Sequence, residues 1–422
     1  MKNSLIAALD VGTTKIAAIV GQKDENNKIK IINFASNPSK GIARGNVENI
    51  NEVITSIKQT LDQLSKNNLH EFNEVYVGIA GQHIVTRYNS TELFFNSATE
   101  ISNIHTEKLK ENIEKTVSDS DEEIIGSLPI LFTIDNQRSV RNPEEIVCES
   151  SLKGNFLLIY AKKTKVNSLR QAINNTGLNI KSMFLEPLAS AEAVLTAEER
   201  KSCVAMIDIG GGTTDLVVCD KNNIVFTSVL PLGGNNITRT IEQKFNISAN
   251  HAEQLKTNLG INSSKEMTFM LESTHQKYLV KDLSDLIRLK YEEIFATVLF
   301  QLENINYLDK VNKLIITGGG SLTINLKQLA NYCTNYEIRI AYPIAVAGVN
   351  LYEKLNDPKF STVIGLLSLG NYEEIKAGQI IEQEKKKENL TTKDNEQEKE
   401  QKKSKFSFSS LIGKILDDNK ND

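Results

Sequence analysis

The chain has 422 residues with 49 Lys and Arg against 53 Asp and Glu, a formal net charge of −4, and 40% hydrophobic residues. This length suffices for about two to four domains with cores of their own, and the near balance of charge excludes the overall basic field that attracts nucleic acid. The four cysteines lack Cys-x-x-Cys spacing, which argues against a disulfide framework or a zinc site.

A strand, an aspartate and a threonine-containing turn open the chain. Apolar residues 6–9 precede Asp10, and the turn that follows contains Gly12, Thr13, Thr14 and Lys15 before a second apolar strand. Glycine N–H groups can approach an anion closely, and a carboxylate beside phosphate oxygens needs a cation such as Mg²⁺ between them. The pattern predicts a phosphate-binding turn, with a plain tight hairpin as the alternative.

Strands and helices then alternate, the order typical of parallel α/β sheets. Apolar residues recur at helical spacing between 53 and 64, and a strand at 75–79 precedes Gly81. From 84 to 160 the chain instead has strand-like runs at 129–134, 145–149 and 156–160, a charged helix around 107–117 and a polar loop at 119–123. This predicts a small α+β subdomain inserted into the first domain, which resumes with a helix at 166–174.

The opening pattern recurs near the middle of the chain. After a linker-like stretch at 198–202, apolar residues lead to Asp208 and to a turn with Gly211, Gly212, Thr213 and Thr214. Two such hairpins on related domains that face one another can hold a chain of phosphates from both sides. We therefore expect a nucleotide clamp in which Asp10 and Asp208 organise Mg²⁺ through its waters.

Further glycines follow two later strands. Gly234 lies where a strand ends and a helix begins, and Gly318, Gly319 and Gly320 follow an apolar run at 314–317. Glycines after a strand let the backbone lie flat against a ligand, and Ser321 could cap the next helix. We place a nucleoside at residues 318–320, with an ordinary strand-to-helix turn as the alternative.

These motifs make the chain similar to the actin-like ATPase superfamily and, within it, to the FtsA family of bacterial cell-division proteins. The resemblance covers roughly residues 5–369 and includes residues 77–81, 186–191 and 316–321. It implies an α/β, actin-like fold with two lobes, a duplicated ribonuclease H-like arrangement. The implied parts are a first actin-like domain at 1–83, 161–197 and about 362–378, an inserted α+β subdomain at 84–160, a second actin-like domain at 198–229 and 308–361, and a helical subdomain at 230–307.

The resemblance implies that both threonine turns hold the phosphates of ATP and that Gly234, Glu253 and Lys256 contact ribose and adenine. Glu253 and Lys256 share a face of a helix that begins near residue 250, so a solvated surface is the alternative. Glu186 resembles the glutamate that DnaK-type chaperones place near the attacking water, although a Glu-Pro step also starts helices well. With Glu186 and Asp208 as the catalytic candidates and no equivalent of the chaperone's lysine, we expect slow or absent hydrolysis.

The end of the chain changes character twice. Residues 379–405 are mostly Glu, Lys, Gln, Asn and Thr, which predicts a disordered charged linker. Within residues 406–418, one helical face carries Phe408, Leu411, Ile412, Ile415 and Leu416. Such a helix is a membrane anchor or a peptide for a partner's groove, and the resemblance favours the membrane. No signal peptide precedes the first strand, and no run approaches the roughly 20 apolar residues of a transmembrane helix.

The resemblance implies a protein that forms actin-like filaments and tethers the tubulin-like protein FtsZ to the cytoplasmic face of the membrane at the division septum, beside other division proteins. Lys290 and Glu293 fall where the family contacts the FtsZ C-terminal peptide, in a helix predicted at 281–302, although a solvated face would look the same. Nucleic acid is not an expected partner.

Two other classes stay open. A pilus-assembly protein of the PilM type shares the fold but is not expected to carry this tail, and a sugar- or acetate-kinase type of phosphotransferase would need an acceptor base, for which no candidate is found. A DnaK-like chaperone would need an appended peptide-binding domain, for which too few residues follow position 369.

Overall fold

A computed structural model of the chain describes residues 5–24, 28–65, 72–116, 121–262, 264, 266–271, 276–344 and 352–376. By its contacts the chain divides into two compact units, Met1–Asn371 and Tyr372–Asp422. The described residues lie in the first unit, apart from residues 372–376, which are helical. Of the helices that can be described, none has the length and apolar character needed to cross a membrane.

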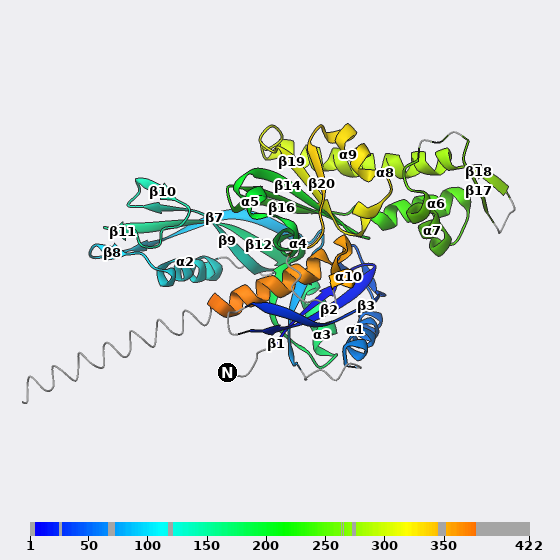
Figure 1. Ribbon diagram of the computed structural model, residues 1–422. Helices are drawn as coiled ribbons and strands as arrows, with labels where there is room; N and C mark the ends of the chain where they lie inside the picture. The colour runs from blue at the N-terminus through cyan, green and yellow to red at the C-terminus, as the bar shows by residue number, and fades with distance from the viewer. Residues whose placement is uncertain are drawn as a thin grey trace, which may run out of the picture. The chain divides into compact units, whose positions relative to one another are not determined.

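The first sheet has the strand order β13-β6-β1-β2-β3, and its strands β1, β2 and β3 are labelled in Figure 1. β1 (Leu5–Val11), β2 (Lys15–Lys23) and β3 (Ile29–Pro38) are antiparallel, while β6 (Glu74–Ile79) and β13 (Asn179–Leu185) continue the sheet in parallel. Because side chains alternate along a strand, Ala7 and Leu9 pack on one face with α1 (Ile50–Ser65) and α3 (Lys163–Asn174). Ile6 and Ala8 pack on the other face with α4 (Glu186–Val194).

The second sheet repeats this plan with the order β16-β15-β14-β19-β20. β14 (Cys203–Ile209), β15 (Thr214–Asp220) and β16 (Asn223–Leu230) are antiparallel, and β19 (Lys313–Thr317) and β20 (Glu337–Ile340) are parallel to β14. One face packs on α6 (Gly234–Phe245), α8 (Val280–Asn304) and α9 (Leu326–Thr334). The other face shares a core with the first sheet, α4 and residues 363–367, so a single apolar cluster joins the two lobes.

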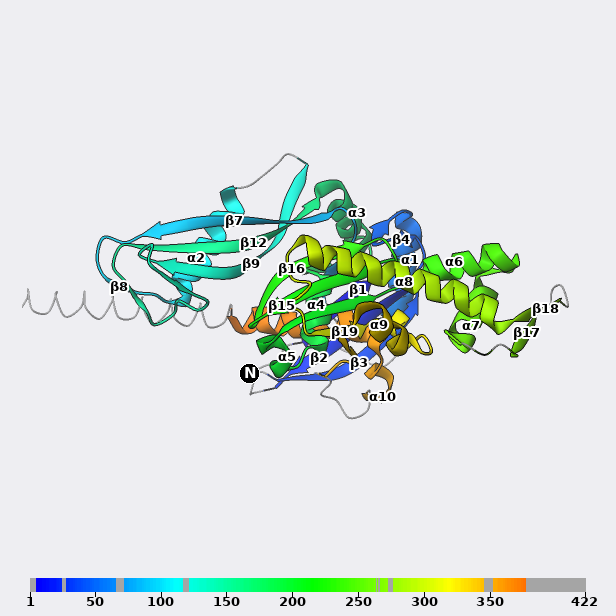
Figure 2. The same cartoon turned by 90° about the horizontal axis from the view of Figure 1, so that it is seen from above.

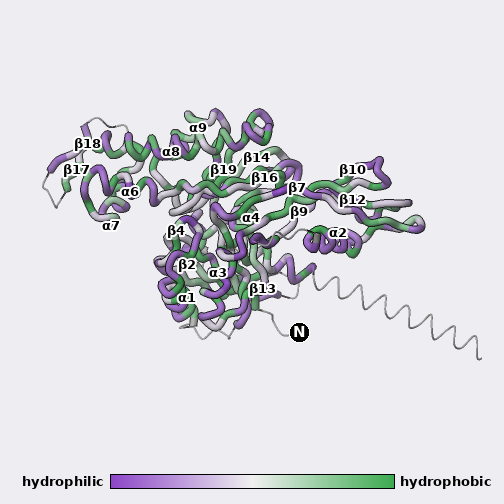
Figure 3. The backbone as a smooth tube through the Cα atoms, turned by 180° about the vertical axis from the view of Figure 1, so that it is seen from behind, coloured by the Kyte–Doolittle hydropathy of each residue, from purple (hydrophilic) through white to green (hydrophobic). Residues whose placement is uncertain are grey.

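The inserted subdomain is an antiparallel sheet of order β10-β9-β12-β7, and its strands β9, β12 and β7 lie side by side in Figure 2. Its strands are β7 (Ile84–Phe94), β9 (Glu122–Ile134), β10 (Arg138–Val140) and β12 (Ser151–Lys162), with the short pair β8 (Thr99–Glu100) and β11 (Val147–Cys148). Helix α2 (Asn103–Thr116) is hydrophilic over much of its length (Figure 3) and buries Leu109 and Ile113 against the sheet. The insertion therefore has its own core.

Shorter elements connect these layers. They are β4 (Ile42–Ala43), β5 (Asn46–Val47), α5 (Ala197–Lys201), α7 (Ala249–Leu259), β17 (Thr268–Leu271), β18 (Gln276–Leu279), the 3₁₀ turns η1 (Gly319–Leu322) and η2 (Pro358–Phe360), and α10 (Tyr352–Leu355). Residues 361–376 are helical. The finer division of the first unit at the boundaries expected from sequence stays a prediction.

Four local expectations were wrong. The linker-like stretch at 198–202 is mostly helix α5, because the Thr196 hydroxyl and the Glu199 carboxylate cap its start reciprocally. The strand expected at 145–149 contains only Val147–Cys148, and the loop expected to reach 123 ends earlier because β9 begins at Glu122. Ser321 caps no following helix, since its hydroxyl donates to the Gly318 carbonyl within η1.

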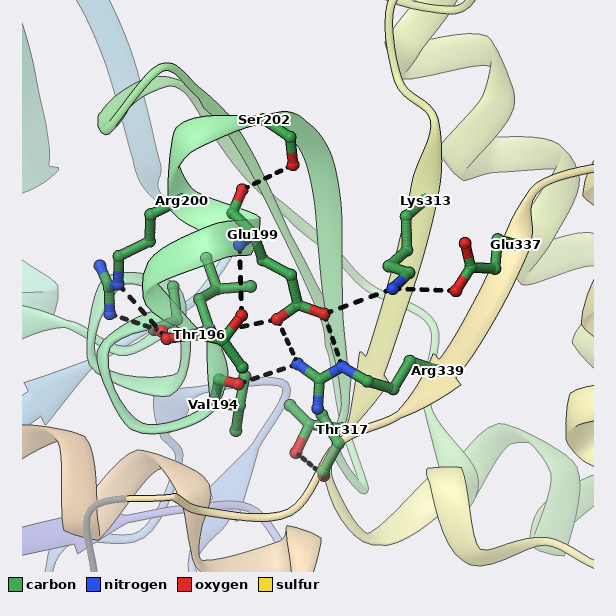
Figure 4. A network of polar contacts seen from close by, with 12 residues as sticks. Val194, Thr196, Glu199, Arg200, Ser202, Lys313, Thr317, Glu337 and Arg339 are labelled. Carbon is green, nitrogen blue, oxygen red and sulfur yellow. Dashed lines mark hydrogen bonds and ion pairs between the residues drawn. The ribbon is translucent and has the colours of Figure 1, made fainter.

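A network of charged side chains fastens α5 to the second sheet (Figure 4). The Arg339 guanidinium on β20 donates to both carboxylate oxygens of Glu199, at 2.7 and 2.6 Å, and Lys313 on β19 lies 3.8 Å from the same carboxylate. Burial by itself would raise the pKa of Glu199, but the hydrogen bonds from Arg339 and from the Thr196 backbone outweigh it and lower that pKa. Glu199 is therefore held in its charged form.

Candidate functional site

The two threonine turns face one another. Each is closed by one backbone hydrogen bond, from Gly12 to Lys15 at 3.0 Å and from Gly210 to Thr213 at 2.9 Å. A Cβ atom built on Gly211 would lie 2.2 Å from the Cγ2 of Thr14. A side chain at position 211 would force Thr14 of the partner turn to shift, so glycine lets the turns of the two lobes approach this closely.

A cleft of about 640 Å³ lies at this junction. The residues expected from sequence that line it are Asp10, Gly12, Thr13, Thr14, Lys15, Glu186, Asp208, Gly211, Gly212, Thr213, Gly234, Glu253, Lys256, Gly318, Gly319 and Gly320. Thr214 is not among the lining residues, because its side chain turns away and donates to the Leu232 carbonyl at 2.7 Å. Residues from Asp10 to Thr362, far apart in the sequence, thus meet in one cavity.

Carboxylates gather at the floor of the cleft. Asp10 accepts a hydrogen bond from the Lys15 ammonium at 2.7 Å, and burial together with Asp10 and Asp215 raises the pKa of Glu186 well above its ordinary value. Burial and the neighbouring Asp208 do the same to Asp215. The charged forms of Glu186 and Asp215 are therefore unfavourable in the protein alone, and a cation at this place would stabilise them.

Several residues that line the cleft or contact its lining were given no role by the sequence patterns. Asp208 accepts from the Ser190 hydroxyl at 2.6 Å and from the Thr362 hydroxyl at 3.4 Å, and Lys359 also lines the cleft. Asp215 directly follows the second turn and Ser190 lies in the 186–191 motif, so the sequence motifs themselves could have indicated both residues. Thr362 and Lys359 carried no such signal, because only folding brings the 358–362 segment beside Asp208.

On the opposite wall, Lys256 is buried and fully hydrogen bonded. Its ammonium lies 2.6 Å from Glu253, 3.1 Å from the Gly234 carbonyl and 2.9 Å from the Thr238 hydroxyl. Burial lowers the pKa of Lys256, although Glu253 opposes that shift. The lysine therefore fixes α7 against the start of α6 and presents the Glu253 side chain at the edge of the cleft.

The remaining candidates lie elsewhere. Lys290 and Glu293 form an ion pair of 2.9 Å on the outer side of α8 and do not line the cleft. That helix is one or two residues longer than predicted at each end, and the expected residues Ile287, Ile294, Val298 and Leu302 are buried. The tail residues Phe408, Leu411, Ile412, Ile415 and Leu416 fall outside the described residues.

Comparison with known proteins assigns the family. A family model described as "Cell division protein FtsA" matches residues 205–365, and one described as "SHS2 domain inserted in FTSA" matches residues 81–160. The chain belongs to the FtsA family. Members of this family are division proteins, and the family implies partners in a division complex and self-association.

Relatives and solved structures agree with this assignment. The chain is 29% identical to the cell division protein FtsA of Neisseria meningitidis serogroup B over 394 residues, covering 90% of the chain and 94% of the relative. It is 27% identical to FtsA of Bacillus subtilis strain 168 over 376 residues, covering 86% and 83%.

Two solved structures show the fold. A chain of a PilM–PilN type IV pilus biogenesis complex has a TM-score of 0.64 at 18% identity, covering 87% of this chain and 98% of that one. MreB 5 of Spiroplasma citri bound to AMPPNP has a TM-score of 0.52 at 13% identity, covering 90% and 99%. The predicted actin-like fold with an inserted α+β subdomain is confirmed. The likeness to PilM extends to the fold alone, whereas both family models are those of FtsA.

Proposed function

We propose that the chain binds ATP with Mg²⁺ between its lobes and, as a filament-forming division protein, tethers FtsZ to the cytoplasmic membrane. The observation that supports nucleotide binding most directly is the approach of the two glycine-threonine turns. Their N–H groups and the hydroxyls of Thr13, Thr14 and Thr213 border one cleft from opposite lobes. This is the donor arrangement that a chain of phosphates requires, because anions bind where several backbone N–H groups converge.

The acids of the second turn fit a divalent cation. Asp208 and Asp215 are directly opposite one another on β14 and β15, and like charges in such a cross-strand pair are destabilising. The Oδ1 atom of Asp215 is buried without a hydrogen-bond partner. Among the described residues, no three acidic, histidine or cysteine side chains are placed to hold a metal ion directly. Asp10, Asp208 and Asp215 would therefore hold Mg²⁺ through its waters, and the ion would neutralise phosphate charge.

The other end of the cleft suits a nucleoside. Gly318, Gly319 and Gly320 offer bare backbone, and Glu253 offers a carboxylate for hydroxyl groups. The Tyr291 hydroxyl donates to the Gly320 carbonyl at 2.9 Å and so fixes the glycine run from behind. We assign ribose and adenine to this end, with Gly234 and Lys256 as the supporting wall.

Hydrolysis is expected to be slow. A general base must be deprotonated to accept a proton, and burial together with Asp10 and Asp215 raises the pKa of Glu186 well above its ordinary value, which disfavours that form. Lys15 carries a positive charge at the first turn, but its ammonium is engaged by Asp10 at 2.7 Å. ATP would then act chiefly as a ligand that joins the lobes, and hydrolysis would adjust contacts between filament subunits.

The tail would supply the membrane contact and α8 the FtsZ contact. The five apolar residues of the 406–418 helix share one face, and Lys290 and Glu293 expose charges on α8. A single tail would bind membrane reversibly, while a filament would array many tails and raise their combined affinity by orders of magnitude. This protein would therefore lie peripherally on the membrane at the division site.

Nucleotide binding is tested by thermal unfolding and filter binding of the full chain. With Mg²⁺ and AMPPNP at 100 times its dissociation constant, the free energy of unfolding should rise by about 2.7 kcal/mol, because the ligand binds only the folded state. EDTA should reduce this increase. Adenosine, which lacks phosphates, should raise the free energy of unfolding much less than AMPPNP does. If neither AMPPNP nor ATP raises the melting temperature or is retained on the filter, the proposal is wrong.

A further inference from the structure

The inserted subdomain, which belongs to the first lobe in sequence, reaches across to the second lobe. The Tyr88 hydroxyl on β7 donates to the Val225 carbonyl on β16 at 2.6 Å. In the reverse direction, the Asn223 side chain at the start of β16 donates to the Ile130 carbonyl on β9 at 3.3 Å. Figures 1 and 2 both show β7 and β9 running beside β16. Both acceptors are main-chain atoms, so the contact depends on the fold of the partner strand rather than on its side chains.

An arginine of the insertion adds a further contact, at the turn between β15 and β16 of the second lobe. Arg141, just after β10, donates to the Asp220 carbonyl at 3.2 Å and to the Lys221 carbonyl. Lys221 and Asn222 form the β15–β16 turn in the left-handed region, with φ of 50° and 68°. The guanidinium therefore grips the outside of a tight two-residue turn.

The β15–β16 hairpin, whose turn Arg141 contacts, adjoins the second phosphate turn at the opposite end of β15. β15 runs from Thr214, next to the turn at 210–213, to Asp220, next to the gripped turn. It is hydrogen bonded on both sides, by β14 and β16, and every residue before Asp220 is buried. Packed interiors transmit displacement rather than absorb it. A displacement of β15 at Asp220 therefore also displaces its other end at Thr214, beside the cleft.

The root of the insertion touches the first phosphate turn. Gly45, with φ of +75°, is packed so closely that a Cβ atom there would lie 2.6 Å from the Ala80 carbonyl oxygen. Its N–H donates to the Thr13 hydroxyl at 3.4 Å. The loop that carries Gly45 thus lies between the first turn and the Ala80–Gly81 segment from which β7 departs.

We propose that the inserted subdomain is a brace that holds the two phosphate turns in register, with Tyr88, Arg141 and Asn223 as positioning residues of the nucleotide site. It is fixed beside the first turn at its root and bonded to the far end of the hairpin that carries the second turn. Opening of the lobes must break these bonds or bend the insertion. The inference rests on the proposed nucleotide function, and it makes the insertion's orientation and nucleotide affinity reciprocally linked.

The test uses full-length protein with Tyr88→Phe, Arg141→Gln and the two combined. Arg138→Gln, an exposed arginine on β10, is the matched control. The double variant should bind Mg²⁺ and AMPPNP about 5- to 10-fold more weakly, mainly through faster dissociation, because the hydrogen bonds that hold the β15–β16 turn are lost. Arg141→Lys, which can still donate to a carbonyl, should recover part of the affinity.

Hydrogen exchange supplies a readout that a purely local loss of stability would not move. With AMPPNP bound, backbone amides of residues 210–214, remote from the substituted side chains, should exchange faster in the double variant than in wild type and the Arg138→Gln control. If the double variant matches wild type in affinity, dissociation rate and hydrogen exchange, the brace proposal is wrong, while the proposed nucleotide binding stands. Failure of wild-type protein itself to bind AMPPNP would overturn the proposed function and the brace with it.

Discussion

At the residue scale, the two copies of the turn differ in one charge. The position after the threonine pair is Lys15 in the first copy and Asp215 in the second. In the first lobe the lysine therefore neutralises its own aspartate, Asp10, at 2.7 Å. In the second lobe two carboxylates, Asp208 and Asp215, oppose each other across paired strands. The carboxylate of the first turn is neutralised within its own lobe, whereas the two carboxylates of the second turn would be stabilised by an added cation.

Asp215→Asn tests this asymmetry. Removing one of two opposed charges should raise the stability of the ligand-free protein by about 0.2–1 kcal/mol. The same change should reduce the extra stability that Mg²⁺ and AMPPNP provide, because a carboxylate near the ion is lost. Denaturant unfolding with and without the ligands measures both effects. Asp62→Asn, on the exposed side of α1, should change neither, and loss of stability in ligand-free Asp215→Asn would contradict the interpretation.

At the element scale, α5 shows how a short helix is kept in place. Five residues cannot form a stable helix alone, since nucleation is costly. The Thr196 and Glu199 cap satisfies the free N–H groups at its start, and Arg339 ties the same glutamate to the edge strand β20. One carboxylate thus serves both the helix end and the contact between elements.

Arg339→Gln should destabilise the fold by about 1.5–3 kcal/mol at pH 7, because hydrogen bonds to a charged, buried Glu199 are lost. The pKa of Glu199 is lowered in the fold, so its contribution is present above its ordinary pKa of 4.5 and is lost as the pH falls through the lower folded value. The difference between variant and wild type should therefore shrink below about pH 4. Urea unfolding across pH measures it. Lys115→Gln, which breaks an exposed pair, is the control and should cost less than 1 kcal/mol.

At the scale of the whole molecule, one apolar cluster runs through both lobes. Helix α4 and residues 363–367 lie in a core shared by the first and second sheets. Thr362, at the start of the same segment, bonds to Asp208 in the cleft. Lobe contact and cleft chemistry therefore share a segment of chain.

Membrane attachment is predicted to be separable from nucleotide binding. The tail's five apolar residues give roughly 8–15 kcal/mol of gross burial, much of it offset by helix ordering. Leu411→Glu or Ile415→Glu should release the protein from anionic liposomes in a co-sedimentation assay and leave AMPPNP binding unchanged. Ser410→Glu puts the same charge on the polar face and should weaken attachment much less. Equal sedimentation of Leu411→Glu and wild type would rule out this anchor.

The sequence by itself determined the local patterns: both strand-and-turn motifs, the α+β insertion and the composition of the tail. These depend on neighbouring residues, where glycine, threonine and apolar spacing constrain the backbone directly. Only the tertiary structure decided that Ser190 and Thr362 bond to Asp208, that Asp215 opposes it, and that Tyr88 and Arg141 reach the second lobe. It also decided that Thr214 turns away from the cleft. Contacts between residues far apart in sequence depend on the packing of the two sheets, which no short stretch of sequence encodes.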